Sequence, residues 1–270
     1  MKGLGNLFQR VERIEEVTKN ILIFLKDNSL EEKKIIEAAK YCKNDLCSEI
    51  VFEFPELQGI MGGKYLKYEG FSEDVCLAVA EHYLPSFSKD ALPSTKYGAI
   101  VSIADKVETL ISIFISGKRP SGSSDPYALR RNLNGVIKII WNYELDLPLD
   151  KLFNELFDFW KIALPNLNFS RERVNSDLNE FLVQRIVSHL EEISLSKELI
   201  KALCSPDEFS QKRVLNIVDL KNRIKSIVFF KEKENFVEIQ KVITRVSKLA
   251  NNSNLSAEVL LIGDLSLIHI

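Results

Sequence analysis

The sequence contains few of the residues that break helices or build metal and disulfide sites. Its 270 residues include only 11 glycines and 8 prolines, fewer than the turns of an all-β protein require, which favours helices. The histidines His82, His189 and His269 lie far apart, so a His-rich metal centre would need several carboxylates to complete it. The four cysteines have no CxxC or zinc-type spacing, and we expect them to be reduced.

Long apolar runs and a strong net charge are also missing. A hydrophobic share of 46% and a net charge of -2 are typical of an ordinary globular protein. The apolar run at residues 21–25 is too short to span a bilayer and the start resembles no signal peptide, so we expect a cytoplasmic protein with no membrane partner. Charge is nevertheless uneven: residues 208–250 carry ten basic and five acidic side chains. Such a face can meet phosphates, although charged helix faces are more often simply solvated.

Apolar residues recur at helical spacing along most of the chain, which predicts an all-α protein of two helical bundles. Residues 97–114 hold only three charged side chains, and we expect them to form the central helix of the first bundle. A second expected helix runs from about Leu30 to about Ile50. Another is expected to start at Asp125, whose carboxylate would cap it, with Pro126 as its first residue.

One set of candidate site residues comprises Asp45, His82 and Asp105, each of which lies next to apolar helix residues. A histidine with two aspartates can hold a divalent metal that activates water for phosphate ester hydrolysis. The simpler interpretation is that Asp45 only stabilises a helix and that His82 is a hydrogen-bonded core residue. A metal-dependent phosphohydrolase and a non-catalytic helical scaffold both stay open as functions.

The second candidate is the adjacent pair Arg130 and Arg131, one and a half turns into the helix expected after Asp125. Two fork-shaped guanidinium groups on neighbouring helix faces suit phosphates or base edges. An ion pair within the bundle is the commoner role of helix arginines, and spacing alone favours it. The residues by themselves therefore predict a cytosolic protein of two helical bundles and no specific activity.

Four segments, taken in order, resemble the beta subunit of the bacterial tetrameric glycine-tRNA ligase. They are FPELQGIMG at 54–62, EHYLP at 81–85, IADKVETL at 103–110 and DPYALRR at 125–131. The resemblance covers nearly the whole chain and is to the C-terminal portion of that subunit, without its long N-terminal portion. It implies an HD-like helical domain at 1–117, a linker at 118–124 and a DALR-type anticodon-binding helical domain at 125–250. Residues 251–270 are expected to be a truncated tail, whose last six residues look like a translated sequencing adapter.

The resemblance also implies a function. The beta subunit would hold tRNA(Gly), while the alpha subunit of an alpha2beta2 heterotetramer uses ATP and Mg to attach glycine. We expect no catalytic residue and no cofactor in this chain. The degenerate HD metal positions are Asn44, Asp45, His82 and Asp105. Asn44 replaces the histidine of the HD pair and no histidine precedes it, and the loss of these two imidazoles disfavours a hydrolase. The expected tRNA-binding residues are all basic: Arg130, Arg131, Lys212, Arg213, Lys221, Arg223, Lys225, Lys241, Arg245 and Lys248.

Overall fold

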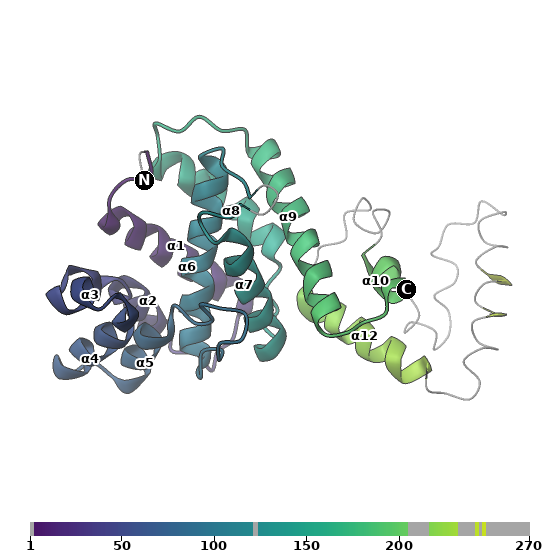
Figure 1. Ribbon diagram of the computed structural model, residues 1–270, viewed down its shortest axis with the longest axis horizontal. Helices are drawn as coiled ribbons and strands as arrows, with labels where there is room; N and C mark the ends of the chain where they lie inside the picture. The colour runs from purple at the N-terminus through teal and green to yellow at the C-terminus, as the bar shows by residue number, and fades with distance from the viewer. Residues whose placement is uncertain (1–2, 121–123, 205–215, 232–240, 243–244, 247–270) are drawn as a thin grey trace. The chain divides into compact units, whose positions relative to one another are not determined.

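A computed structural model describes residues 3–120, 124–204, 216–231, 241–242 and 245–246 (Figure 1). These ranges contain helices and no β-sheet, which confirms the all-α prediction. The α-helices are α1 (Leu7–Leu25), α2 (Glu32–Tyr41), α3 (Glu49–Glu53), α4 (Ile60–Tyr68), α5 (Glu73–Glu81), α6 (Lys96–Ile115), α7 (Leu129–Tyr143), α8 (Leu149–Ala163), α9 (Arg171–Glu192), α10 (Lys197–Leu203) and α12 (Ile217–Lys231). Two short 3-10 helices, η1 (Asn44–Cys47) and η2 (Pro55–Leu57), flank α3.

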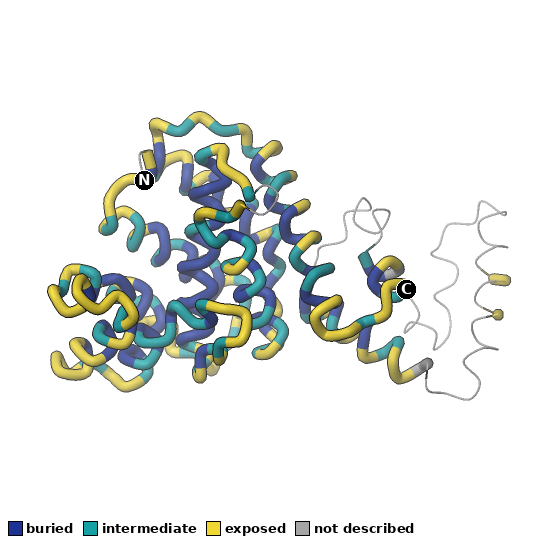
Figure 2. The backbone as a smooth tube through the Cα atoms, viewed as in Figure 1, coloured by how far each residue is buried: buried dark blue, intermediate teal, exposed yellow. Residues whose placement is uncertain are grey.

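Helix α6 is the central helix that the sequence predicts. Thr95 caps its start, since the Thr95 hydroxyl accepts a hydrogen bond from the Gly98 N–H at 3.0 Å. Almost every α6 residue is buried, because α1, α2, α5, α7 and α9 all pack against it (Figure 2). Asp105, Lys106 and Glu108 are therefore charged groups inside the protein. Such groups are stable only when they are paired and hydrogen-bonded.

The predicted start of α7 was wrong by three residues, although its cap was correctly identified. Residues before the helix form a separate turn, in which the Ala128 N–H donates to the Asp125 carbonyl at 3.1 Å and Ala128 adopts a left-handed φ of 55°. The Asp125 carboxylate reaches past this turn and accepts hydrogen bonds from the N–H groups of Leu129, at 2.8 Å, and Arg130, at 2.9 Å. The helix thus begins at Leu129 and not at Pro126.

The single helix expected from about Leu30 to about Ile50 was also wrong. Helix α2 ends at Tyr41, and Lys43 leaves helical geometry with φ -114° and ψ 6°. Ser48 is extended, and its hydroxyl accepts a hydrogen bond from the Val51 N–H at 3.3 Å, which starts α3. This break turns Lys43 into the protein interior.

The contacts divide the chain into two compact units, residues 1–218 and residues 219–270. Helices from both sides of the expected linker at 118–124 pack together in the first unit, as α6 does with α7 and α9. Buried Trp160 of α8, for example, donates its indole N–H to the Ser112 hydroxyl of α6 at 3.0 Å. The division into an HD-like and a DALR-type domain stays a prediction. Within the described ranges we found no helix with the length and apolarity needed to cross a membrane.

Candidate functional site

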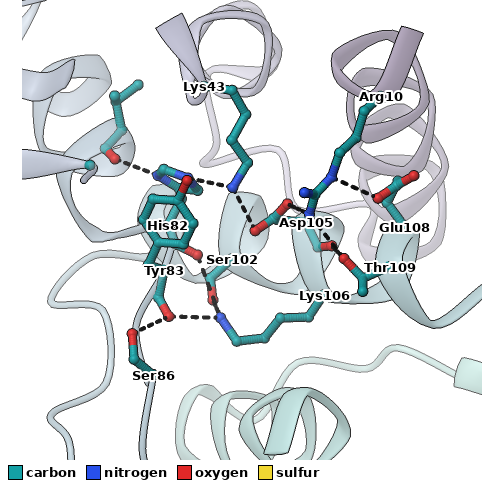
Figure 3. A network of polar contacts seen from close by, with 12 residues as sticks. Arg10, Lys43, His82, Tyr83, Ser86, Ser102, Asp105, Lys106, Glu108 and Thr109 are labelled. Atoms are coloured by element: carbon teal, nitrogen blue, oxygen red, sulfur yellow. Dashed lines mark hydrogen bonds and ion pairs between the residues drawn. The ribbon is translucent and has the colours of Figure 1, made fainter. Parts of the chain in front are cut away.

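A buried network of charges surrounds the middle of α6 (Figure 3). Lys43 is 1% exposed, and its ammonium lies between two of the predicted site residues. It donates to Asp105 Oδ2 at 2.8 Å and contacts His82 Nε2 at 2.9 Å. His82 Nδ1 lies 2.6 Å from the Val79 carbonyl oxygen, which can only accept, so Nδ1 carries the proton and Nε2 accepts from Lys43. His82 is therefore the neutral tautomer.

The pKa values follow from this geometry. Burial and the Lys43 cation lower the pKa of His82 well below its usual range. Burial alone would lower the pKa of Lys43, but Asp105, with smaller contributions from Cys42 and Tyr83, raises that pKa overall. Burial opposes ionisation of Asp105 as well, yet Lys43 and Arg10 hold the pKa of this carboxyl below its usual range. At neutral pH the arrangement is an ion pair beside a neutral imidazole.

A second layer of charges joins α1 to α6. The Arg10 guanidinium donates to Asp105 Oδ1 at 2.8 Å and to Glu108 Oε2 at 3.0 Å. Arg13, which is 2% exposed, donates to Glu108 Oε1 at 2.9 Å. Two carboxylates of α6 thus bind three cations, two from α1 and Lys43. The hydrogen bonds between α1 and α6 join residues that are 95 or more positions apart in the sequence.

Lys106, which follows Asp105 on α6, binds the backbone of the residues just before Pro85. Its ammonium donates to the Leu84 carbonyl at 3.1 Å, the Tyr83 carbonyl at 3.2 Å and the Ser102 hydroxyl at 2.8 Å. Burial lowers the pKa of Lys106 to about 7. The residues that follow Leu84 are consequently held against the centre of the protein.

The structure does not assemble the predicted HD-type metal positions. Asp45 Oδ2 accepts hydrogen bonds from the N–H groups of Gly59, at 2.6 Å, and Gly62, at 3.2 Å, and so holds the start of α4. Asn44 is exposed on η1. Only His82 and Asp105 come together, and Lys43 lies between them.

These residues do not fit a divalent metal. A metal between His82 and Asp105 would have to displace the Lys43 ammonium or lie beside it, against its positive charge. Across the described parts of the chain, no group of three or more His, Cys, Asp or Glu side chains is arranged to hold a metal ion. Sequence reasoning missed Lys43, whose only signal was its place after Ala39 and Cys42 on the apolar face of the preceding helix. It also missed Arg10 and Glu108, whose roles no pattern in the sequence indicated.

The pair Arg130 and Arg131 lies at a pocket of about 450 Å³, formed by α7, α9 and residues 85–88. Lys138 and Arg185 also line this pocket. The Arg131 guanidinium lies over the Phe87 ring, 5.2 Å from its centroid, and Arg130 makes a long 3.4 Å contact with a backbone carbonyl. Within the described residues neither arginine forms the intramolecular ion pair that spacing alone favoured.

The remaining predicted tRNA-binding residues fall near the end of the chain. Lys221, Arg223 and Lys225 lie on α12, where Arg223 Nε pairs with Asp219 Oδ2 at 3.0 Å. Two more side chains are exposed, and three lie outside the described residues. The exposed ones are Lys241 and Arg245, and those outside are Lys212, Arg213 and Lys248. Their contact with tRNA stays a prediction.

The fold and this site define an all-α protein with a salt-bridged centre and an arginine-lined pocket beside it. The family profile described as glycyl-tRNA synthetase beta subunit matches residues 1–205. The chain therefore belongs to the glycyl-tRNA synthetase beta subunit family.

Curated relatives agree with this membership. The chain is 37% identical to the glycine-tRNA ligase beta subunit of Trichodesmium erythraeum, over 93% of this chain and 35% of that protein. It is also 37% identical to the protein of the same name from Thermodesulfovibrio yellowstonii, over 93% of this chain and 34% of that protein. The relative from Rickettsia bellii is 35% identical over 95% of this chain and 35% of its own length. The chain thus spans about a third of these relatives, and the C-terminal position expected for that third stays a prediction.

Proposed function

We propose that this chain is part of the tRNA-binding beta subunit of a glycine-tRNA ligase. The observation that carries the proposal is the family match over residues 1–205. In this proposal the beta subunit holds tRNA(Gly), and the alpha subunit uses ATP and Mg to activate glycine and transfer it. The assembly is a cytoplasmic alpha2beta2 heterotetramer, and this chain contributes by positioning the RNA.

Two features of the chain suit that role. Basic side chains of α12 and the residues after it would neutralise backbone phosphates, with release of counterions. Arginine side chains such as Arg130 and Arg131 would bind phosphates or stack on unpaired anticodon-loop bases. Neither task requires a reacting group in this chain.

A metal-dependent phosphohydrolase is not favoured, because His82 Nε2 and Asp105 Oδ2, the atoms that would bind a metal, already contact the Lys43 ammonium. A non-catalytic scaffold differs from the proposal in having no affinity for tRNA. Binding of tRNA and its dependence on salt therefore separate the proposal from both alternatives.

The test is charge reversal on α12. We expect the triple variant Lys221→Glu, Arg223→Glu and Lys225→Glu to weaken tRNA(Gly) binding at low salt. The slope of log affinity against log salt should fall by roughly one for each phosphate that the variant no longer neutralises. Filter binding or fluorescence anisotropy at several salt concentrations measures both quantities.

A matched control reverses three exposed lysines elsewhere on the surface, Lys40, Lys64 and Lys67, with the same change in net charge. If both triple variants changed the salt slope equally, the effect would be one of net charge and the assignment to α12 would be wrong. If the unmodified chain and its assembled ligase showed no affinity for tRNA(Gly), the proposed function itself would fail.

A further inference from the structure

The arginine-lined pocket beside α7 contains an excess of positive charge. Three guanidinium groups line it, from Arg130, Arg131 and Arg185, and the carboxylate among the lining residues is that of Asp125. Both Asp125 oxygens already accept hydrogen bonds from the backbone at the start of α7. The ammonium of Lys138, the fourth cation, pairs with Glu192 at 2.7 Å. Within the pocket the three guanidinium charges therefore face one carboxylate, that of Asp125.

Arg185 shows the effect of this excess positive charge most directly. Its Nε atom is buried and has no hydrogen-bond partner, although it lies on the wall of a pocket large enough for a ligand. Burial and the nearby positive charge of Arg130 lower the pKa of Arg185, and Asp125 offsets this only in part. A buried N–H without a partner is costly, as is a pair of like charges at close range. An anion accepting from Arg185 and Arg130 would relieve both costs.

The other lining groups show which anion fits. Phe87 is 62% exposed, and the Arg131 guanidinium lies over its ring, so an aromatic ring and a guanidinium lie together beside Arg130 and Arg185. Nucleic-acid bases stack on aromatic rings and on guanidinium planes. The side-chain oxygen of Asn134 is buried without a partner on the same wall, where it can accept from a ribose hydroxyl or a base N–H.

We infer that this pocket binds one nucleotide of a single-stranded RNA segment. Its phosphate would lie between Arg130 and Arg185, and its base would stack against the pair of Phe87 and Arg131. The inference rests on the proposed function, since the RNA in question is the tRNA that the subunit holds. It adds the place on the chain where an unstacked nucleotide is held.

The experiment compares two glutamine substitutions on the same helix, α9. Arg185→Gln removes a charge from the pocket, and Arg173→Gln removes one from an exposed position near the start of the helix. For Arg185→Gln we expect weaker tRNA(Gly) binding and a salt slope smaller by roughly one, whereas Arg173→Gln should match the unmodified chain. Phe87→Ala should weaken binding about tenfold with an unchanged slope, because stacking releases no counterions.

Equal slopes for Arg185→Gln and Arg173→Gln would overturn the inference. If Arg185→Gln does not fold, Arg130→Gln, which also removes a charge from the pocket lining, carries the same prediction, with circular dichroism as the check on folding.

Binding of inorganic phosphate and of AMP tests the pocket independently of tRNA binding. Should the unmodified chain fail to bind tRNA(Gly) while AMP raises its melting temperature and not that of Arg185→Gln, the pocket would bind a free nucleotide and the RNA assignment would be wrong. Should neither phosphate nor AMP nor tRNA bind, the pocket inference would fall with the proposed function. If tRNA(Gly) bound equally well with and without Arg185, the proposed function would be supported and only the pocket inference would be refuted.

Discussion

Lys43 decides the chemistry at the centre of the first unit. A histidine and an aspartate on neighbouring helices suggest a metal site, but here the cation between them is an ammonium covalently attached to the chain. Such a cation cannot activate water as a Lewis acid, and it leaves no open coordination position. What it does is bind the end of α2 to α5 and α6 through a buried ion pair and a hydrogen bond.

Replacing Lys43 should therefore cost stability. We expect Lys43→Met to lower the free energy of unfolding by about 3 kcal/mol, because one partner of a buried pair is removed while the Asp105 charge stays inside. Arg10 still binds Asp105 in the variant, which keeps the loss at the low end of the usual range. Urea unfolding measures the effect. Lys33→Met, at an exposed position of α2, is the control and should stay within about 0.5 kcal/mol of the unmodified chain.

Single residues were predictable where their neighbours in sequence define their role. The apolar face around His82 indicated a hydrogen-bonded core histidine, and the structure shows one. Asn44 and Asp45 were matched to a family motif, but a motif cannot show that the chain turns one residue earlier and directs Lys43 inward. Arg185 lies 55 residues beyond Arg130, and only the packing of α7 on α9 brings the two to one pocket.

At the scale of elements, the capping residue of α7 was more predictable than the first residue of that helix. Asp125 before a run of apolar residues correctly indicated a cap for α7. The turn closed by Ala128 moves the first helical residue to Leu129. The cap is kept because the carboxylate can reach the free N–H groups across this turn. The break after α2 depends on buried charge pairing and on Ser48, and helical periodicity continues through it unchanged.

The cap on α7 makes a measurable prediction. We expect Asp125→Ala to lower the free energy of unfolding by about 1–2 kcal/mol, because two backbone N–H groups lose their acceptor. Asp125→Asn retains one side-chain acceptor and should lose less. Glu155→Ala, at an exposed position of α8, is the control. A cost for Asp125→Ala no larger than for Glu155→Ala would show that solvent replaces the cap.

At the scale of the whole molecule, helices from both sides of the expected linker pack together, and the division into two domains stays a prediction. The sequence signals at 116–124 are those of a loop, and loops can join helices of one core as readily as two domains. The helical type of the elements followed from periodicity, but their grouping depends on contacts such as that of Trp160 with Ser112, which no local pattern contains.

The charge network also predicts how stability depends on pH. The pKa of Asp105 is below its ordinary value of 3.8 in the folded protein, so at acid pH the unfolded state binds more protons than the folded state. The stability that ionised Asp105 contributes should therefore be present above its unfolded pKa of 3.8 and be lost as the pH falls further. Urea unfolding at a series of pH values measures this decline. In Asp105→Asn, whose stability is lower throughout, the decline should be shallower, and an equal decline in both proteins would contradict the assignment.

The hydrogen bonds from Lys106 to the carbonyls of Tyr83 and Leu84 have a consequence for the proposed binding of a nucleotide. Phe87 stands only three residues beyond Leu84, so the aromatic ring at the pocket is mounted on a segment already anchored to α6. A ring held in this way loses little conformational entropy when a ligand stacks on it, and more of the contact energy remains as affinity. In the proposed complex with RNA, Lys106 would thus fix the segment that carries Phe87 without contacting the nucleotide itself.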